Sequence, residues 1–528
     1  MRTKNSLKNL ISGAVSEFLY AVLGFVVRTV FIRTLSQEYL GINGLLSGIF
    51  TMLNLANLGL DGAIIFAMYK PMAEQDLSRC RALVRFYRNA YRIIGTVILL
   101  LGLALSPFLE VLAKGSTDLV DLRIVYFLCL LENVTSYWFF AYLGSVPTSD
   151  QKDYLNTQVR YLVRVAESLL KILSLWLLRA TPMLSFYVFS GIGVVCGIGR
   201  SLVVRIRVRR RYPWVDDLEG AALPPEEKKG IYKNVAGMAV NKISSVLNDG
   251  IDSTIVSAYL GVAATGVFTN YLTLKNYVVM ILRMFFNSIA ASVGNLCAVE
   301  TKEKQEDFFR SLQFSCFWVY GFGAICFFLL MDHFIAGVWI RKAGWLLSRW
   351  DVLLLSFNFL IEGMAKAVIT FRDARGLYWQ TRYRYIFSSV FNAVLSVVLV
   401  GPLRMGVTGA LLGTSASLII MVSFDPVLVY RQIFEKSAAE YYRMYFGQMS
   451  LVLLTGVLAW LACMPFVSIS KGNFLARLGI CLVLPNGLWY LLYRKDPRFL
   501  YLRDTVLRFG KSAMRKIRGK RQGEDQTS

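Results

Sequence analysis

Uninterrupted apolar segments of about 20 residues recur along nearly the whole chain of 528 residues. A helix of that length crosses the hydrocarbon core of a bilayer, where the backbone must satisfy its own hydrogen bonds. Hydrophobic residues make up 55% of the chain and the mean hydropathy is +0.50, which is not typical of a soluble domain. The sequence therefore predicts an all-α, polytopic membrane protein. We place about fourteen transmembrane helices at 10–32, 40–69, 86–113, 119–146, 155–178, 183–206, 234–258, 264–296, 308–332, 350–371, 383–402, 406–430, 443–467 and 474–493.

The basic residues indicate the orientation of these helices. Most of the 58 Lys and Arg residues fall in the N-terminus, in the loops on the same side and in the C-terminal tail. This pattern places both termini in the cytoplasm. The net charge of +24 requires no nucleic-acid partner, because basic clusters such as 205–211 bind anionic lipid headgroups. A specific soluble partner is the alternative for these clusters.

Two further features bear on targeting and chemistry. The first apolar stretch carries Glu17 and Arg28 and is too long for a cleaved signal peptide, so we expect it to be the first transmembrane helix. The eight cysteines are scattered without CxxC spacing, which predicts neither a disulfide framework nor a metal site.

An internal duplication organises the chain. Leu40-Gly41 followed by Gly48-Ile49-Phe50-Thr51 matches Leu260-Gly261 followed by Gly266-Val267-Phe268-Thr269. The displacement covers six predicted helices, so both copies begin on the same side of the membrane and form a parallel repeat of two six-helix lobes. We predict an N-lobe at 1–206 (helices 1–6), a cytoplasmic linker at 207–233, a C-lobe at 234–433 (helices 7–12), two further helices at 434–493 and a basic cytoplasmic tail at 494–528.

Charged residues inside the spans are the candidates for function, because a cation at the bilayer centre costs about 2.5–3.5 kcal/mol on insertion scales. Spacings of 7 and 11 residues place side chains on one helix face, as for Lys242 with Asp249 and Glu17 with Arg28. Such stripes recur in helices 1, 2, 7 and 8 and predict a shared hydrophilic cavity. The members of these stripes are Glu17, Arg28, Asp61, Lys242, Asp249, Asp252, Lys275 and Arg283.

Other charges in the spans have a simpler interpretation. Glu167 with Lys171 and Glu362 with Lys366 are spaced i, i+4 with Glu first, which favours local ion pairs. Charge balance within the bundle is likewise the alternative for the stripes above, with Lys242 paired to Asp249 and Glu17 to Arg28 or a neighbouring helix. Glu132 and Asp425 are single charges without a partner in the local sequence, and Asp425 precedes Pro426, a candidate kink.

Three sequence segments together resemble a known family. They are Leu23-Gly24-Phe25 with Arg28, Leu40-Gly41 with Gly44-Leu45, and Leu58-Gly59-Leu60-Asp61-Gly62-Ala63. With the two six-helix lobes, they resemble the polysaccharide transporters, Wzx-type flippases of lipid-linked oligosaccharides, within the multidrug/oligosaccharidyl-lipid/polysaccharide exporter superfamily. The resemblance covers essentially the whole chain.

The resemblance implies that helices 1, 2, 7 and 8 line a central cavity whose arginines hold a lipid pyrophosphate. Arg28 and Arg283 are then the expected phosphate-binding residues, and guanidinium suits bidentate binding of phosphate. Lys242 and Lys275 would add positive charge. The acidic residues Glu17, Asp61, Asp249 and Asp252 are expected to couple transport to protons or sodium, with no other cofactor.

We expect a flippase in the bacterial cytoplasmic membrane that moves a polyprenyl-pyrophosphate-linked oligosaccharide by alternating access, as a monomer, with polysaccharide polymerase machinery as a further partner. A multidrug exporter or lipid II flippase of the same fold is the main alternative. A membrane polysaccharide polymerase is less favoured, because the predicted external loops are short. Gly510-Lys511-Ser512 lacks the preceding glycine of a nucleotide-binding loop, and His333 is the single histidine, so the sequence predicts no enzyme.

Overall fold

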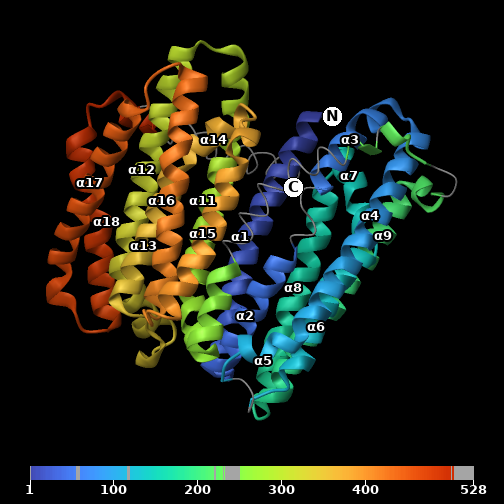
Figure 1. Cartoon of the computed structure of the whole chain (residues 1–528), viewed down its shortest axis with the longest axis horizontal. Coiled ribbons are helices and arrows are strands. Elements are labelled where there is room, and N and C mark those ends of the chain that lie inside the picture. The colour runs from blue at the N-terminus through green and yellow to red at the C-terminus, as the bar shows by residue number, and fades with distance from the viewer. Residues whose placement is uncertain are drawn as a thin grey trace, which may run out of the picture. The chain divides into compact units, whose positions relative to one another are not determined.

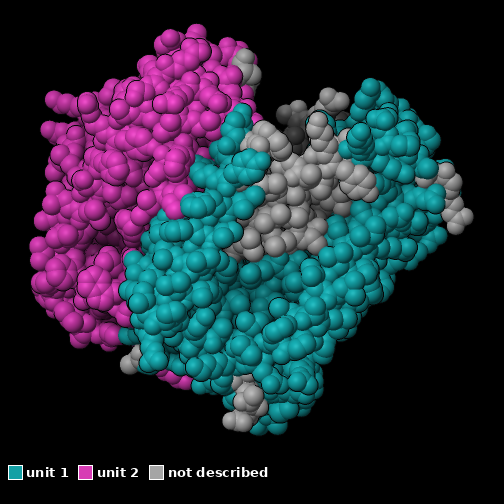
Figure 2. All heavy atoms as spheres, viewed as in Figure 1, with its two compact units in different colours: residues 1–285, 344–347, 379–417 teal, residues 286–343, 348–378, 418–528 magenta. Residues whose placement is uncertain are grey.

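The computed structural model describes residues 2–54, 60–115, 119–218, 222–226, 228–229, 231, 250–500 and 502–504. The described residues form helices joined by short connections and contain no strand (Figure 1). They divide into two compact units (Figure 2). Unit 1 comprises residues 1–285, 344–347 and 379–417, and unit 2 comprises residues 286–343, 348–378 and 418–528.

Unit 1 is built from the N-terminal helices and parts of three later ones. Residues 250–260 are helical and belong to it, as does most of α11, while α15 and α16 contribute their residues between 379 and 417. The helices are α1 (Arg2–Thr34), α2 (Gln37–Leu53), α3 (Leu60–Glu74), α4 (Leu77–Leu105), α5 (Leu109–Leu112), α6 (Leu122–Trp138), α7 (Ser145–Ser149), α8 (Tyr154–Leu177), α9 (Pro182–Arg211), α11 (Val262–Val299), α15 (Tyr378–Val400) and α16 (Val407–Val429).

Unit 2 has a core of long helices around α12. The helix α12 packs against α13, α14, α17 and α18. It ends in a π-helical segment at His333–Trp339, and a second π-helical segment, Tyr430–Phe434, follows α16. The helices of this unit are α12 (Lys302–Asp332), α13 (Arg349–Met364), α14 (Lys366–Ala374), α17 (Ala439–Cys463) and α18 (Lys471–Tyr493).

The predicted all-α polytopic fold is confirmed. Each of the fourteen predicted spans overlaps a helix among the described residues, and the span at 234–258 does so through residues 250–258. Within this described part, eight helices are long and apolar enough to cross a membrane by length and composition. A ninth forms if α6 and the segment Ala141–Ser149, bent by 52° at Phe139 and Phe140, count as one span. The chain is a multi-pass membrane protein. The predicted linker at 207–233 is only partly described, and the division into lobes stays a prediction.

Glycines bring the two copies of the predicted repeat into close contact. A Cβ atom added to Gly41 of α2 would lie 1.6 Å from the carbonyl oxygen of Val262, at the start of α11. On the other side of the contact, a Cβ at Gly266 would lie 2.2 Å from the carbonyl oxygen of Gln37. Gly48 faces the backbone of Gly250 in the same way. Small residues of this kind let helix backbones approach closely in membranes, so α2, α11 and 250–260 are held together by backbone contact.

The structure corrects the interpretation of Asp425 as a charge without a partner. The Arg372 Nη1 atom of α14 lies 3.1 Å from Asp425 Oδ2 on α16, and both side chains are buried. Helix α16 continues through Pro426 to Val429. The two local pairs predicted from i, i+4 spacing are confirmed, with Lys171–Glu167 at 2.6 Å and Lys366–Glu362 at 3.7 Å.

Candidate functional site

Helix α8 carries the charged side chains around which the candidate site is built. Arg160, Arg164, Glu167 and Lys171 follow one another at spacings of four, three and four residues. This spacing places them on one face of an α-helix. That face is covered rather than left to lipid, because α8 packs against α1 and α9.

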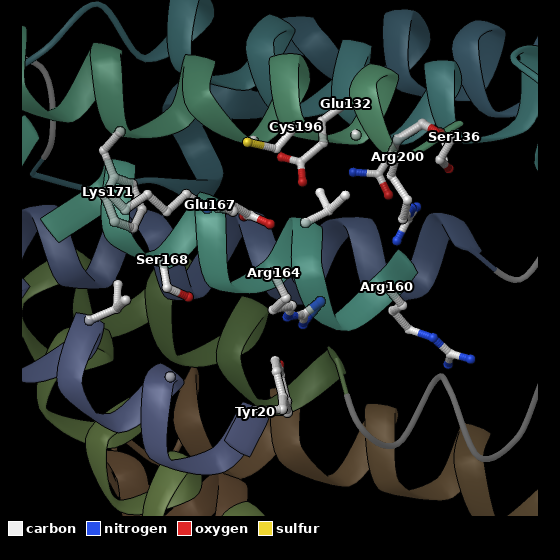
Figure 3. Close-up of a pocket in the computed structure, with 17 residues that line it drawn as sticks. Tyr20, Glu132, Ser136, Arg160, Arg164, Glu167, Ser168, Lys171, Cys196 and Arg200 are labelled. Carbon is white, nitrogen blue, oxygen red and sulfur yellow. Dashed lines mark hydrogen bonds and ion pairs between the residues drawn. The ribbon is translucent and has the colours of Figure 1, made fainter. Parts of the chain in front are cut away.

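A cavity of about 350 Å³ lies among α1, α6, α8 and α9 (Figure 3). Tyr20, Gly24 and Val27 of α1 form one part of its wall. Its charged lining is Glu132 from α6, the four α8 residues named above and Arg200 from α9. All of these helices belong to unit 1. The cavity is therefore contained within one unit and lies inside the predicted N-lobe.

Two of the cations in the cavity are fixed by aromatic rings. The Arg164 guanidinium carbon lies 3.9 Å from the centre of the Tyr20 ring (Figure 3). The Lys171 ammonium lies 4.7 Å from the centre of the Phe189 ring and also forms the ion pair with Glu167. Cation–π contact orients a cation while leaving its N–H groups free to bind other ligands. Arg164 in particular presents its donors to the cavity.

Glu132 is the acidic residue opposite α8. Its carboxylate and that of Glu167 point toward one another (Figure 3). A Cβ atom at Gly193 of α9 would lie 2.5 Å from Glu132 Oε2, so the glycine provides the space that the carboxylate occupies. The structure thus gives Glu132, a single charge in the sequence, a place beside the basic residues of α8.

The charge balance of the cavity favours anions. Four cations, Arg160, Arg164, Lys171 and Arg200, face two carboxylates. Walls of low dielectric constant concentrate the field of such an excess and attract counter-ions of opposite sign. Guanidinium groups suit phosphate in particular, because they offer parallel N–H donors. Among the described residues, no group of three His, Cys, Asp or Glu side chains could hold a metal ion.

Arg28, the leading candidate from the sequence, lies next to this cavity but does not line it. Its Nε donates to Asn270 Oδ1 and its Nη2 to Thr269 Oγ1, each at 3.0 Å, so it joins α1 to α11. Within the part of the chain whose side chains the structure describes, Arg28 forms no ion pair with a carboxylate. Glu17 does not pair with it, because eleven residues of helix separate the two by about 16 Å.

The structure describes the side chains of some of the other predicted site residues but not of all of them. Lys275 is half-buried on α11, Arg283 of the same helix is exposed, and Glu17 is half-buried on α1. Asp252 is buried, and its Oδ2 accepts a 2.7 Å hydrogen bond from Thr414 Oγ1 on α16. Asp61 belongs to α3, but its side chain lies outside the described part, and Lys242 and Asp249 lie outside the described residues altogether.

Arg160, Arg164 and Arg200 are not among the site residues predicted from the sequence. Arg160 and Arg164 stand in a more polar stretch than the predicted candidates, whereas Arg200 stands in an apolar segment and is followed by Ser201-Leu202-Val203-Val204. The signal that identifies Arg160 and Arg164 is the run of charges at spacings of four, three and four in α8, which marks a charged helix face. Arg200 lies on α9 and has no such signal. In a bundle within a membrane such a face must cover a neighbour or a cavity.

Comparison with known proteins shows which fold this chain has. No protein-family model matches the chain, and no curated protein matches it. A solved structure of the lipid II flippase MurJ, in an inward closed conformation, is similar with a TM-score of 0.63 and 13% identity, covering 91% of this chain and 98% of that chain. An inward-facing multidrug resistance MATE family transporter of the MOP superfamily is similar with a TM-score of 0.59 and 13% identity over 79% of this chain and 98% of its own.

A third similar structure is a MOP superfamily transporter from Pyrococcus furiosus, for which a reverse polarity of the binding pocket is described. It gives a TM-score of 0.54 at 13% identity, covering 83% of this chain and 97% of that one. The chain therefore has the fold of the MOP superfamily transporters. The expected superfamily architecture is confirmed in this sense, and the Wzx-type branch stays a prediction.

Proposed function

We propose that the protein is a flippase that moves a polyprenyl-pyrophosphate-linked oligosaccharide across the bacterial cytoplasmic membrane. The observation that carries this proposal is the cavity among α1, α6, α8 and α9, where four cations face two carboxylates. A diphosphate crossing hydrocarbon needs compensating cations along its path. The fold, shared with MurJ and MATE transporters, supports a transporter rather than an enzyme.

The residues have distinct roles in this proposal. Arg164, held over Tyr20, and Arg200 bind the phosphate oxygens, while Glu167 holds Lys171 in position at the end of the cavity. Arg28 sits where α1 meets α11 and adds positive charge beside the cavity. Arg283, Lys275 and Lys242 complete the phosphate-binding set expected from the sequence. The saccharide follows the diphosphate, and the polyprenyl tail stays in lipid.

Ion coupling is assigned to the acidic residues expected from the sequence, Glu17, Asp61, Asp249 and Asp252. Asp252 has the best supported position of these, because it is a buried carboxylate hydrogen-bonded to a hydroxyl of a different helix. A carboxylate oxygen and a hydroxyl oxygen from two segments therefore meet at this buried position, which suits a proton or a sodium ion.

A multidrug exporter of organic cations is the main alternative. The charge of the cavity argues against it, because a surplus of arginine and lysine repels a cationic cargo. A lipid II flippase would share the diphosphate and differ only in the saccharide. The two carry the same phosphate chemistry, and the choice of saccharide rests on the resemblance in the sequence.

The proposal is tested with the purified full-length protein in liposomes. A fluorescent polyprenyl-diphosphate saccharide is placed in both leaflets, and its movement is followed by quenching from outside. We expect flipping at least about tenfold faster than in empty liposomes, and slower movement of the matching monophosphate, because fewer charge-assisted hydrogen bonds form. Uptake of an organic cation dye without lipid flipping would overturn the proposal.

A further inference from the structure

An apolar groove in unit 2 lies far in sequence from the charged cavity. It has a volume of about 440 Å³ and is bounded by α12, α13 and α17. Helix α12 packs against both of the other helices. All of its lining residues belong to unit 2. Nothing in the proposed transport function uses this groove.

The walls of the groove are hydrocarbon and aromatic. Phe328, Leu353 and Val457 represent its three helices, and Val457 is 52% exposed. Gly456 keeps the groove open on the α17 side, because a Cβ atom there would meet a single atom within 4 Å, Ile325 Cγ1 at 3.7 Å. An apolar hollow of this kind holds water poorly and suits a hydrocarbon chain.

One cation lies in the lining of the groove. The guanidinium carbon of Arg349, the first residue of α13, lies 5.7 Å from the centre of the Phe328 ring and 5.6 Å from that of Trp460. The carboxylate of Asp351, two residues further on, belongs to the helix cap, where it accepts a 3.1 Å hydrogen bond from the backbone amide of Ser348. Among the described residues, Arg349 forms no ion pair with a carboxylate.

We propose that this groove binds an anionic glycerophospholipid of the bilayer, with one acyl chain between α12, α13 and α17 and its phosphate on Arg349. The combination of an apolar groove with an unneutralised guanidinium matches a lipid tail joined to a phosphate. Exposed Trp350, at 71% exposure, lies beside Arg349, and tryptophan is enriched at the level of lipid headgroups. On the predicted topology, this end of the groove faces the outer leaflet.

The test uses native mass spectrometry of the full-length protein in detergent, titrated with palmitoyl-oleoyl phosphatidylglycerol. Wild type should bind one molecule more tightly than the rest. Gly456→Leu fills the groove and should weaken that binding at least about tenfold. Arg349→Gln should weaken it by about tenfold, because a charge-assisted hydrogen bond to phosphate is lost.

Gly447→Leu is the matched control on the same helix. Gly447 is exposed, and a Cβ atom there meets nothing within 4 Å, so this variant should bind lipid as wild type does. Circular dichroism confirms that each variant keeps its helical content. Unchanged binding by folded Gly456→Leu or by Arg349→Gln would overturn the proposal. So would displacement of the bound molecule by polyprenyl phosphate but not by phosphatidylglycerol, which would identify the cargo lipid as the occupant. None of these outcomes depends on transport.

Discussion

Arg164 shows how a single side chain can be held ready for an anion inside a membrane protein. Tyr20 supports the face of its guanidinium at 3.9 Å, so the planar group is oriented before any ligand arrives. Ordering a long side chain on binding costs free energy, and a fixed guanidinium avoids part of that cost. Lysine at the same place would lose the parallel donors, because its ammonium is a point charge.

Replacement of Arg164 should therefore lower the flipping rate of a diphosphate lipid in liposomes. We expect Arg164→Gln to reduce it about tenfold or more, since hydrogen bonds to charged groups contribute roughly 1.5–3 kcal/mol. Arg164→Lys should restore part of the rate. Arg179→Gln, an exposed change in the turn after α8, is the control and should leave the rate unchanged. Equal rates for Arg164→Gln and wild type would remove Arg164 from the site.

Lys171 and Glu167 should behave as a partly buried ion pair. Their side chains are 17% and 23% exposed, so removing one partner leaves the other charge poorly solvated. We expect Lys171→Met alone to cost about 1–3 kcal/mol of unfolding free energy. The double variant Lys171→Met with Glu167→Gln should recover most of it, as measured by denaturant unfolding in micelles. Additive losses in the double variant would show that the pair contributes no coupling.

At the level of elements, the contact of α2 with α11 and residues 250–260 depends on glycines, which have no side chain to keep the helices apart. Gly41, Gly48 and Gly266 each face backbone atoms of the neighbouring segment, and backbone cannot move aside as a flexible side chain can. The same glycines are part of the repeated sequence segments. The predicted duplication places these glycines in matching segments, and these segments are in contact in the structure.

Gly41→Ala should separate these helices. A methyl group within 1.6 Å of the Val262 carbonyl cannot be accommodated without a backbone shift, and overpacking costs about 1–3 kcal/mol. The measurement is thermal unfolding in detergent. Gly191→Ala on α9, where a Cβ meets nothing within 4 Å, should keep or slightly raise stability. A stable Gly41→Ala variant would contradict the close contact.

Hydropathy predicted the helices well, because the bilayer requires long apolar segments wherever the chain crosses it. The local ion pairs could be predicted from i, i+4 spacing, because residues at that spacing are neighbours on one helix and form the pair for that reason. Arg372 and Asp425 are 53 residues apart, and no local pattern indicates that contact. The cavity was missed because its charges come from α6, α8 and α9 together. Of these helices, only α8 has a charge pattern that can be recognised in the sequence.

At the scale of the whole molecule, transport needs an energy source as well as a binding site. Asp252→Asn keeps an oxygen that can accept from Thr414 and removes the charge. We expect this variant to flip lipid at a rate that no longer depends on an imposed proton or sodium gradient. Asp121→Asn, a change before α6, is the control and should retain the dependence. Unchanged gradient dependence in Asp252→Asn would exclude Asp252 from coupling.

The central claim is that the protein moves a lipid-linked saccharide by means of cations in and beside one cavity. It is tested most directly by depleting the protein in its native cell and measuring lipid-linked oligosaccharide in the cytoplasmic leaflet. We predict accumulation that wild type clears, and that Arg28→Ala and Arg164→Ala do not clear at equal membrane abundance. Absence of accumulation on depletion would contradict the cargo, and clearance by both variants would contradict the role of the cations.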